Sequence, residues 1–338
     1  MNHKYLVLYF EKKGGVFAGA FDSLNGTEGA RFVQCAPVSF YHRFFRRLAF
    51  TSRIQFPLQK QLASYYRKKE VRYIVSEMDR MKNDEKLPVL ITNNWFERSV
   101  KNGVIKALKE HYPSLRVVYY FSDIIKTNRV RKEIISHPEW YSADLILTFD
   151  PGDAVKYGLS CCRLPFGMTL PADGETRYEV CFLGRAKERY SKILEIYDYL
   201  IRKGVTCKFY VITEDEKIRD RRAGIEYRKH AIPYEEYLNI EKESRCLLEI
   251  IQDDSCGYTA RVPEAVFLSK KLITNNQAML SDENYDPKNI LVFQKAEDID
   301  VEFIRDTEPA VYKEDFREVF DPQRFLQLVD DKLNEKFS

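Results

Sequence analysis

Residues 252–276, QDDSCGYTARVPEAVFLSKKLITNN, hold the group of side chains in this sequence that is best suited to chemistry. A polar loop comes first, and its glycine, Gly257, lets a ligand approach the backbone closely. Thr259, or a residue just before it, can cap a helix, and the pattern that follows predicts a helix over residues 260–269. The amide groups of a first helical turn point towards such a loop and attract anions.

Two charged side chains lie in that helical segment. Arg261 places a guanidinium near the loop, and Glu264 places a carboxylate about one turn further along. The amides and the guanidinium suit phosphate, and the carboxylate suits ribose hydroxyls, so the segment is typical of a nucleotide site. An ordinary loop followed by a capped helix explains the same residues equally well.

Apolar runs of strand length alternate with helical patterns along the chain. The strands and helices that these patterns predict must position the polar loop that contains Gly257. The pattern predicts strands over residues 5–10, 31–37, 87–92, 115–121, 144–149, 178–183, 207–212, 246–251 and 272–274. It predicts further helices over residues 102–111, 188–203, 235–243 and 322–336. Strands that alternate with helices form parallel sheets, so we expect an α/β fold.

The alternation is interrupted at residues 165–177, PFGMTLPADGETR, which are rich in Pro, Gly and polar residues. A chain of 338 residues is also long for a single core. We therefore expect two Rossmann-like, doubly wound domains that face each other across a cleft, at residues 1–170 and 171–321. Residues 322–338 would add a C-terminal helix with an apolar face of Phe325, Leu326, Val329 and Leu333.

The composition is that of a soluble globular protein, with 44% hydrophobic and 31% charged residues. No apolar run reaches the length of about 18 residues that a membrane-spanning helix needs. The seven cysteines show no CxxC or zinc-ligand spacing, which favours a reduced, cytoplasmic protein without a metal site. The sequence also lacks the GxSxG, HExxH and GxxxxGK[ST] motifs of several hydrolases and nucleotide-binding proteins.

Charge is distributed unevenly along the chain. Residues 1–165 carry 27 Lys and Arg against 16 Asp and Glu, a net charge of +11, whereas residues 166–338 carry a net charge of −8. Basic and aromatic side chains are interleaved over residues 40–72, which favours a surface that contacts an anionic membrane. Two amphipathic helices packed on a sheet would explain the same pattern. Nucleic acid would match the charge, but no recognised binding motif accompanies it, so we expect no nucleic-acid partner.

Polar residues follow several of the expected strands, at the positions where open α/β sheets bind ligands. Asp123 stands out because it comes just after the very apolar run LRVVYYF. It is a candidate for a functional carboxylate, and capping of the next helix is an equally good explanation.

Five segments carry a family resemblance through their order and spacing rather than through a single motif. They are SADLILTFDPGDAVKYGL in the first half and FLGRAKERY, IPYEEYL, LLEIIQDDSCGYTARVPEAVFLSKKLITNN and NYDPKNILVF in the second. Together they resemble a glycosyltransferase of the GT-B class. The second-half segments are similar to the nucleotide-sugar-binding half of bacterial enzymes that build capsular polysaccharide, O-antigen or related oligosaccharides. The similarity is strongest over residues 178–293. The resemblance also implies that the C-terminal helix, residues 322–338, returns to the N-terminal domain, and packing of this helix on its own domain is the alternative.

The resemblance implies a donor site in the second half of the chain. It places the pyrophosphate of a nucleotide-sugar against Gly184, Arg185 and Lys187, and the base beside Tyr234. The residues that it implies near phosphate are Ser255, Gly257, Thr259 and Arg261, and Glu264 would hold the ribose.

The resemblance also implies how the sugar would be transferred. An inverting enzyme needs a general base for the acceptor hydroxyl, and the candidates in the first half are Asp123, Glu11 and Asp22, in that order. Retaining GT-B enzymes often carry two glutamates with seven residues between them. Here Cys256 stands where the first glutamate would precede Glu264, so the stereochemistry stays open, with a preference for inversion.

The implied substrates are a nucleotide-sugar donor and a lipid-linked or oligosaccharide acceptor in surface polysaccharide biosynthesis. We expect no bound metal or other cofactor, because helix amides and basic side chains offset the charge of the leaving diphosphate. The sequence Asp298-Ile299-Asp300 lies in an acidic run and is not expected to bind a metal. The protein would work in the cytoplasm, peripherally at the inner face of the cell membrane. The alternative is a non-catalytic GT-B-like protein that is a partner or regulator of a polysaccharide assembly complex.

Overall fold

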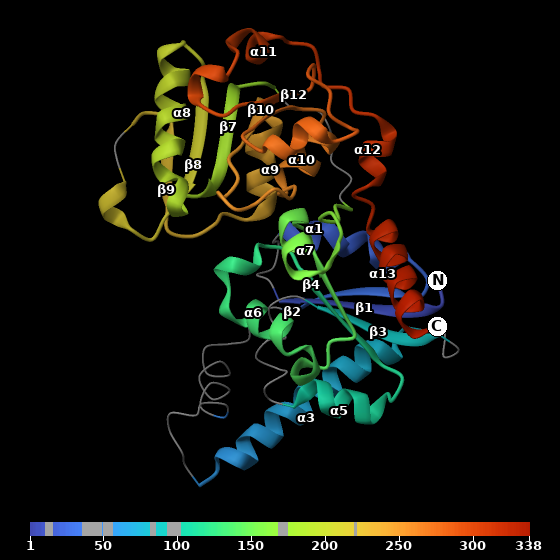
Figure 1. The fold of residues 1–338 in the computed structure, drawn as a ribbon. Coiled ribbons are helices and arrows are strands. Elements are labelled where there is room, and N and C mark those ends of the chain that lie inside the picture. The colour runs from blue at the N-terminus through green and yellow to red at the C-terminus, as the bar shows by residue number, and fades with distance from the viewer. Residues whose placement is uncertain are drawn as a thin grey trace. The chain divides into compact units, whose positions relative to one another are not determined.

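The computed structural model describes residues 1–10, 16–35, 57–81, 86–92, 103–167, 175–219 and 222–338, together with Ala49. The chain divides into two compact units (Figure 1). Unit 1 consists of Met1–Gly167 and Pro322–Ser338, and unit 2 consists of Met168–Asp321. Each unit is built around its own parallel sheet, as the alternation of strands and helices predicts.

The sheet of unit 1 has six parallel strands in the order β2-β1-β3-β4-β5-β6. These strands are β1 (His3–Phe10), β2 (Ala30–Cys35), β3 (Leu87–Thr92), β4 (Arg116–Phe121), β5 (Leu145–Thr148) and β6 (Ser160–Cys161). The central strands β3 and β4 are buried on both faces, and this explains why they read as continuous apolar runs in the sequence.

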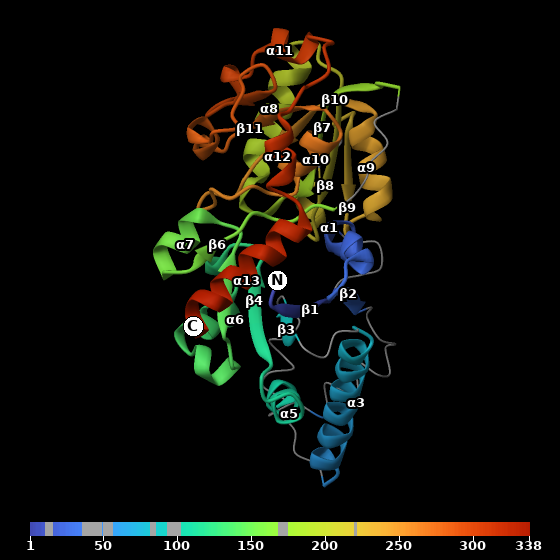
Figure 2. The ribbon, with the colours of Figure 1, turned by 90° about the vertical axis from the view of Figure 1, so that its right-hand side faces the viewer.

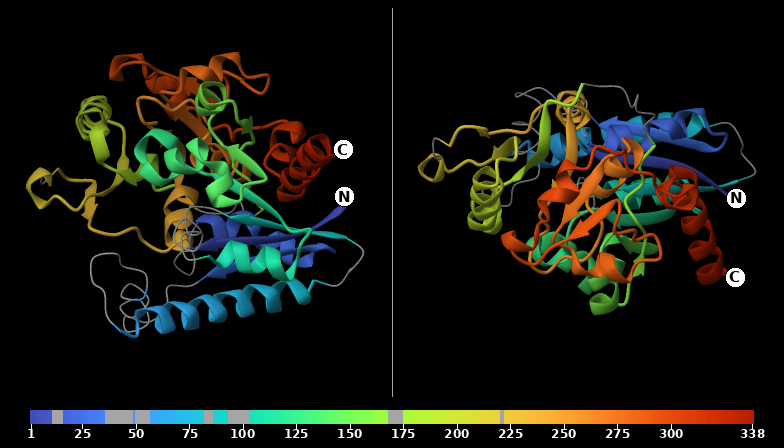
Figure 3. Two further views of the ribbon diagram at one scale, coloured as in Figure 1. Left: turned by 60° about the horizontal axis from the view of Figure 1, so that its bottom comes forward. Right: turned by 90° about the horizontal axis from the view of Figure 1, so that it is seen from above.

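Helices cover both faces of this sheet. One face packs against α3 (Gln59–Asp79), α5 (Val104–His111) and α6 (Arg129–Ser136). The other face packs against α1 (Val16–Phe21) and α13 (Pro322–Phe337). Phe325 of α13 contacts Phe21 and Tyr120 there, at ring-centroid distances of 5.6 and 5.0 Å. Figure 3 shows α3 in blue and α13 in red.

One buried carboxylate holds α13 to β1. Asp330 accepts hydrogen bonds from the amide of Asn2 and the hydroxyl of Tyr5, and its Oδ1 lies 2.8 Å from Nδ1 of His3. Burial raises the pKa of Asp330, but the hydrogen bonds from Tyr5, His3 and the Asn2 amide outweigh burial and hold the pKa at about 2. The apolar face expected for this helix is confirmed, because its members are buried: Phe325, Leu326, Val329 and Leu333.

The sheet of unit 2 also has six parallel strands, in the order β12-β11-β10-β7-β8-β9. These strands are β7 (Tyr178–Arg185), β8 (Cys207–Ile212), β9 (Ile225–Arg228), β10 (Ser244–Glu249), β11 (Lys271–Thr274) and β12 (Ile290–Val292). From β7 the chain adds β8 and β9 on one side, and then returns to add β10, β11 and β12 on the other. The order therefore reverses between β7 and β10.

Helices lie on both faces of this sheet as well (Figures 1 and 2). α8 (Tyr190–Arg202) and α11 (Val301–Arg305) share a core with one face, through residues such as Ile196, Leu248 and Ile304. α9 (Tyr234–Lys242) and α10 (Arg261–Phe267) pack on the opposite face. α12 (Glu314–Glu318) then leads to α13.

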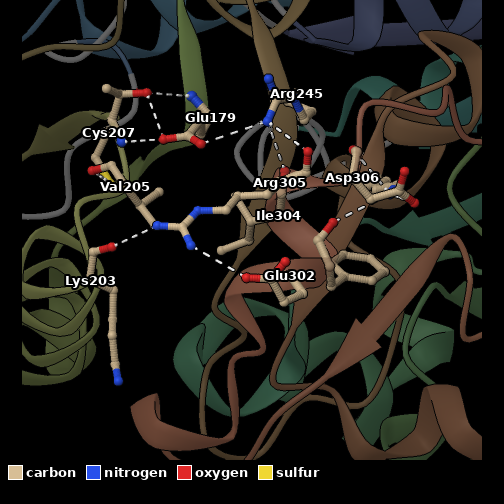
Figure 4. Close-up of polar contacts among 12 residues, drawn as sticks. Glu179, Lys203, Val205, Cys207, Arg245, Glu302, Ile304, Arg305 and Asp306 are labelled. Atoms are coloured by element: carbon tan, nitrogen blue, oxygen red, sulfur yellow. Dashed lines mark hydrogen bonds and ion pairs between the residues drawn. The ribbon is translucent and has the colours of Figure 1, made fainter.

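A polar network closes the amino edge of the unit 2 sheet (Figure 4). Arg245 at the start of β10 donates hydrogen bonds to the carbonyl oxygens of Ile304 and Arg305, at 3.1 and 3.4 Å. The same guanidinium lies 3.7 Å from the carboxylate of Glu179 on β7. Arg305 donates in turn to the carbonyl oxygen of Lys203 at 3.2 Å. These contacts fix α11 over this edge.

Each expected strand agrees with an observed strand to within two residues at either end. The sequence pattern does not predict β6, β9 or β12, because β6 and β12 have only two and three residues and the edge strand β9 has no fully buried position, so none of them forms a clear apolar run. The expected helix over residues 260–269 is too long: α10 begins at Arg261 and ends at Phe267. Ser269 has a φ of 52°, in the left-handed region that an α-helix cannot include. None of the described helices is long and apolar enough to span a membrane.

Candidate functional site

The carboxyl edge of the unit 2 sheet, between β7 and β10, is where an open α/β sheet binds ligands. The chain leaves β7 towards β8 on one side and leaves β10 towards β11 on the other, so two loops diverge at this point. They are residues 186–189 after β7 and residues 250–260 after β10. Both contain residues that the sequence predicts for a donor site.

Three of these residues lie at the end of β7. Gly184 and Arg185 are the last residues of the strand, and Lys187 follows in a left-handed backbone conformation with a φ of 44°. Such a conformation is costly for a residue with a Cβ atom and is often found at functional sites. The Nζ atom of Lys187 donates to Oε1 of Gln252 at 3.0 Å, so an exposed cation bridges the two loops.

The side chain of Arg189 also connects the end of β7 with the loop after β10. Its guanidinium donates hydrogen bonds to the carbonyl oxygen of Arg185, at 3.2 Å, and to that of Ile250. A Cβ atom at position 184 would lie 3.0 Å from the ring of Phe182 and 3.6 Å from Nη2 of Arg189. The tighter of these two approaches is to the Phe182 ring, so glycine at this position leaves room for that ring.

The loop after β10 contributes Ser255, Gly257 and Thr259. The Ser255 amide donates to the carbonyl oxygen of Gln252 at 3.0 Å, which forms a turn. The Thr259 hydroxyl oxygen accepts a hydrogen bond from the Arg261 amide at 3.2 Å, but the N-cap residue of α10 is Ala260, so Thr259 supports the turn before the helix and does not cap it as the sequence predicts. The structure thus brings the two predicted loops together at one edge of the sheet.

Glu249 is missing from the residues that the sequence predicts for this site. It is the last residue of β10, only 3% exposed, and it accepts hydrogen bonds from the hydroxyls of Thr259 and Thr274. The signal that could have revealed it is a carboxylate inside the apolar run LLEII. A charged residue at the buried end of a central strand is uncommon unless its oxygens have partners.

Tyr234, Arg261 and Glu264 also come together, but in the interior of unit 2. The Tyr234 hydroxyl donates to Oε1 of Glu264 at 2.7 Å, and both side chains are buried. Nη1 of Arg261 lies 2.7 Å from Oε2 of Glu264 and also pairs with Glu241 of α9. Nη2 of Arg261 donates to the carbonyl oxygen of Leu183 on β7 at 3.3 Å. This buried cluster joins α9 and α10 to the sheet.

The buried cluster holds two carboxyl groups and one guanidinium away from water. Burial and the neighbouring Glu264 raise the pKa of Glu241, which favours its protonated form. Burial and Glu264 also raise the pKa of Tyr234, so its hydroxyl stays a hydrogen-bond donor. Arg261 and Glu264 have partners inside unit 2, and their contacts with phosphate and ribose stay predictions. The contact of Tyr234 with a base stays a prediction as well.

In unit 1 the strand order reverses between β1 and β3, and the segments that directly follow these two strands lie outside the described residues. Glu11 belongs to the first of these segments. Asp22 begins the short 3₁₀ helix η1 (Asp22–Gly26); it is exposed and accepts a hydrogen bond from the side-chain amide of Asn25 at 3.1 Å.

Asp123 follows β4, and 42% of its side chain is exposed. Its Oδ1 accepts a hydrogen bond from the Ile124 amide at 3.0 Å, and its Oδ2 lies 3.7 Å from Nη1 of Arg131. The residue that caps α6 is Asn128, whose side chain accepts hydrogen bonds from the amides of Val130 and Arg131. The alternative that Asp123 caps this helix is therefore wrong, and its catalytic role stays a prediction.

Two buried carboxylates shape the loop that carries Asp123. Asp150 caps α7 (Pro151–Tyr157) by accepting a hydrogen bond from the Asp153 amide at 2.9 Å. Asp153 accepts a hydrogen bond from the Ile125 amide at 2.7 Å, and burial raises its pKa although this amide opposes the rise. The run DPGD after β5 thus has a structural role, because it supports the backbone next to Asp123.

Among the described residues, no group of three or more His, Cys, Asp or Glu side chains is arranged to hold a metal ion. The two carboxylates of the DID sequence accept hydrogen bonds from backbone amides. Asp298 accepts hydrogen bonds from the amides of Gln294 and Lys295, and Asp300 caps α11.

No protein-family model and no curated protein matches this sequence. Solved structures are similar over nearly the whole chain. Trehalose-6-phosphate synthase OtsA is 9% identical with a TM-score of 0.55, over 98% of this chain and 99% of that one. Anabaena Alr3699/HepE, solved with UDP and glucose, is 10% identical with a TM-score of 0.53, over 97% and 99%. A UDP-forming α,α-trehalose-phosphate synthase from Burkholderia xenovorans is 10% identical with a TM-score of 0.52, over 99% and 100%.

At 9–10% identity these similarities establish the fold of the chain and not its activity. Two Rossmann-like domains, each with a six-stranded parallel sheet, make up the GT-B fold that these structures share with this chain. The α/β fold with two Rossmann-like domains that is expected from the sequence is confirmed.

Proposed function

We propose that the chain is a glycosyltransferase that moves a sugar from a nucleotide-sugar donor to a saccharide acceptor. The observation that carries the proposal is the bridge between Lys187 and Gln252 at the carboxyl edge of unit 2. Lys187 and the neighbouring Arg185 are exposed there, and such cations offset the charge of a diphosphate as it leaves. HepE was solved with UDP and the Burkholderia enzyme is UDP-forming, so UDP is the first nucleotide to test.

The donor would lie along the two loops. Gly184, Arg185 and Lys187 would contact the pyrophosphate, and the backbone and hydroxyls of Ser255, Gly257 and Thr259 would contact the remaining phosphate oxygens. Arg261 and Glu264 are paired with each other at 2.7 Å, so their proposed contacts with phosphate and ribose require an exchange of partners. The donor needs no bound metal in this scheme, because the two exposed cations supply the positive charge.

Asp123 is the proposed general base. Its carboxylate is partly exposed, and the Ile124 amide orients Oδ1, while Oδ2, which would accept the proton, lies 3.7 Å from Nη1 of Arg131. Deprotonation of the acceptor hydroxyl by this oxygen would give inversion at the sugar carbon. Glu11 and Asp22 are the second and third candidates.

The proposed acceptor is a lipid-linked or oligosaccharide intermediate of surface polysaccharide biosynthesis. A lipid-linked acceptor lies in a membrane, and the basic and aromatic residues 40–72 would bind the protein to the surface of that membrane. Residues 57–72 belong to the part of the chain that the structure describes, and several basic side chains of α3 are exposed there: Lys60, Arg67, Lys68, Lys69 and Arg72. These side chains would favour a peripheral position on an anionic bilayer surface in the cytoplasm.

A thermal-shift panel of UDP, GDP, CMP, CDP and dTDP tests this function. A nucleotide at a hundred times its Kd stabilises the native state by about 2.7 kcal/mol. We expect one nucleotide to raise the melting temperature of the wild-type protein, and to raise that of Lys187→Ala less. No shift with any of the five would favour the alternative of a non-catalytic partner or regulator of a polysaccharide assembly complex.

A further inference from the structure

A buried carboxylate supports the edge of the sheet at which the proposed donor would bind. Glu249 is the last residue of β10 and is 3% exposed. Its neighbours Leu248 and Ile250 belong to the core on the α8 face of the sheet. Successive side chains of a strand point to opposite faces, so Glu249 points to the face on which α10 packs. The donor contacts proposed above do not include it.

Both carboxylate oxygens of Glu249 are occupied by threonine hydroxyls. Thr259 donates to Oε1 at 2.5 Å, and Thr274, at the end of β11, donates to Oε2 at 2.6 Å. An ionised carboxylate only accepts hydrogen bonds, so each hydroxyl must point its hydrogen towards Glu249. This leaves the oxygen lone pairs of the threonines for other donors.

Those lone pairs orient the backbone of the site. Thr259 accepts a hydrogen bond from the Arg261 amide at 3.2 Å, and Thr274 accepts one from the Asn276 amide at 3.0 Å. The Asn276 side chain then donates to the carbonyl oxygens of Cys256 and Gly257, at 3.1 and 3.4 Å. A continuous chain of hydrogen bonds therefore runs from Glu249 to the loop that contains Gly257 and Thr259.

The neighbouring asparagine holds the other end of the loop. Oδ1 of Asn275 accepts a hydrogen bond from the Ile251 amide at 2.7 Å, just after β10. The loop is thus tied to the end of β11 both where it leaves β10 and at residues 256–257. Its shape depends on the backbone conformation at the end of β11, and Glu249 sets the hydroxyl orientation there through Thr274.

From this network we infer that Glu249 is a positioning residue, which holds the loop of residues 255–259 in the shape that receives the diphosphate of the nucleotide. The inference rests on the proposed function. Burial of a carboxylate is costly, and well-packed apolar residues stabilise a core equally well, so stability alone gives little reason for a charge at this position. Burial raises the pKa of Glu249, and the hydrogen bonds from Thr259 and Thr274 oppose that rise.

Substitution of Thr274 tests the inference without touching a proposed ligand contact. Thr274→Val keeps the shape of the side chain and removes the hydroxyl, whereas Thr274→Ser keeps the hydroxyl. Thr148 is a matched control, because it is also fully buried, ends a strand of unit 1, and accepts a hydrogen bond from the amide two residues later. The Kd for UDP, or for whichever nucleotide of the panel binds the wild type, is measured by calorimetry at a temperature at which each free variant is folded.

We expect the Kd to rise about tenfold in Thr274→Val, the effect of one lost hydrogen bond of about 1.4 kcal/mol. Thr274→Ser and Thr148→Val should bind within a factor of about two of the wild type, a difference that corresponds to less than about 0.5 kcal/mol. Equal binding by wild type and Thr274→Val would overturn the inference and leave the proposed function intact. A loss in Thr274→Ser as large as in Thr274→Val would also overturn it, since the hydroxyl would not be the cause.

Glu249→Gln provides a second test if Thr274→Val does not fold. Its amide nitrogen can donate but not accept, so one threonine must reverse its hydroxyl while the side-chain volume is preserved. A Kd at least tenfold weaker, in a variant that melts as a folded protein, supports the inference, and an unchanged Kd overturns it. If the wild-type protein binds none of the five nucleotides, the proposed function fails, and the inference fails with it.

Discussion

Two cations near the proposed donor site, Lys187 and Arg261, differ in what surrounds them. Lys187 is exposed and has one neutral partner, the Gln252 side chain at 3.0 Å. Arg261 is 7% exposed and is paired with Glu241 and Glu264. An anionic ligand can therefore recruit Lys187 at the cost of one neutral hydrogen bond, whereas it must compete with carboxylates for Arg261. Substitutions at these positions should consequently have different effects.

Replacement of Glu264 by alanine should lower stability before any nucleotide is added. The Tyr234 hydroxyl would lose the acceptor that lies 2.7 Å away, in a site that water does not reach. A buried donor without a partner costs about 1–3 kcal/mol. Urea unfolding without nucleotide measures this loss, and Glu235→Ala, an exposed change on α9, is the control. Wild-type stability in Glu264→Ala would contradict the role of Glu264 in the buried cluster.

Replacement of Asp123 by asparagine should reduce turnover. A positioned general base contributes a factor of about 10² to 10⁴ to the rate, so kcat should fall at least a hundredfold while the Kd of the nucleotide is unchanged. Initial rates of nucleotide release in the presence of an acceptor measure the effect. Glu139→Gln changes an exposed carboxylate on the same unit and should retain the wild-type rate. A fully active Asp123→Asn variant would show that Asp123 is not the general base and would leave Glu11 and Asp22 as the candidates.

The individual residues of the site are predicted from the sequence less completely than the strands and helices are. Gly184, Lys187 and Thr259 were expected at one edge of a sheet, and the structure places them there. Glu249 was not expected, because a single carboxylate in LLEII has no spacing partner, and its threonine partners lie 10 and 25 residues away. The partners of Glu264 and Arg261 in the buried cluster include Tyr234 and Glu241 from another helix, which a local pattern does not contain.

At the scale of elements, α13 and β1 are joined by the carboxylate of Asp330. Its pKa lies at about 2 in the folded protein against an ordinary value of 3.8. A lowered pKa means that the folded state favours the charged form, so this stabilisation is fully present above pH 3.8 and is lost as the pH falls towards 2.

Asp330→Asn should therefore destabilise unit 1 at pH 7 by about 2 kcal/mol. The difference in free energy of unfolding between wild type and variant should shrink as the pH is lowered from 5 to 3, because the Asp330 carboxylate of the unfolded wild-type chain, with the ordinary pKa of 3.8, gains a proton while that of the folded protein stays charged. Urea unfolding at several pH values measures it. Asp331→Asn, an exposed change one residue further along α13, should show a much smaller difference. A difference that does not vary with pH would contradict this account of the α13 contact.

Elements with a long, regular pattern could be predicted well. β3 and β8 have the predicted bounds, because each is an apolar run of strand length between polar segments. The end of α10 could not be predicted, since its sequence continues a helical pattern to Ser269 and only the left-handed backbone at that residue stops it. β6, with two residues, exists because it pairs with β5 and has no local signal of its own.

At the scale of the whole molecule, charge is the property that bears on partners. The first 165 residues carry a net charge of +11, and basic side chains are exposed on α3. Arg43, Arg46 and Arg47 lie outside the described residues, so their part in a basic surface stays a prediction. The sequence alone suffices for this property, because net charge does not depend on how the chain folds.

Changing Arg43, Arg46 and Arg47 to Glu should weaken binding to vesicles that contain anionic lipid. Each Lys or Arg near such a surface contributes about 1 kcal/mol, so the triple variant should lose at least a hundredfold in partition coefficient at low salt. Sedimentation with anionic and with neutral vesicles measures the effect. Lys203, Lys288 and Lys313 changed together to Glu alter the net charge equally on unit 2 and should retain most of the binding. Equal sedimentation of wild type and the arginine variant would contradict the membrane proposal.

The most direct test of the central claim, a nucleotide-sugar site at the carboxyl edge of unit 2, is calorimetric titration of UDP into three proteins. They are the wild type, Lys187→Ala, and Lys203→Ala, which removes an exposed lysine at the opposite edge of the same sheet. We predict saturable binding to the wild type, the same Kd for Lys203→Ala, and a Kd about ten to a hundred times weaker for Lys187→Ala, the effect of one charged hydrogen bond. A wild-type protein that binds neither UDP nor another nucleotide of the panel, or a Lys187→Ala variant that binds as tightly as Lys203→Ala, would contradict the claim.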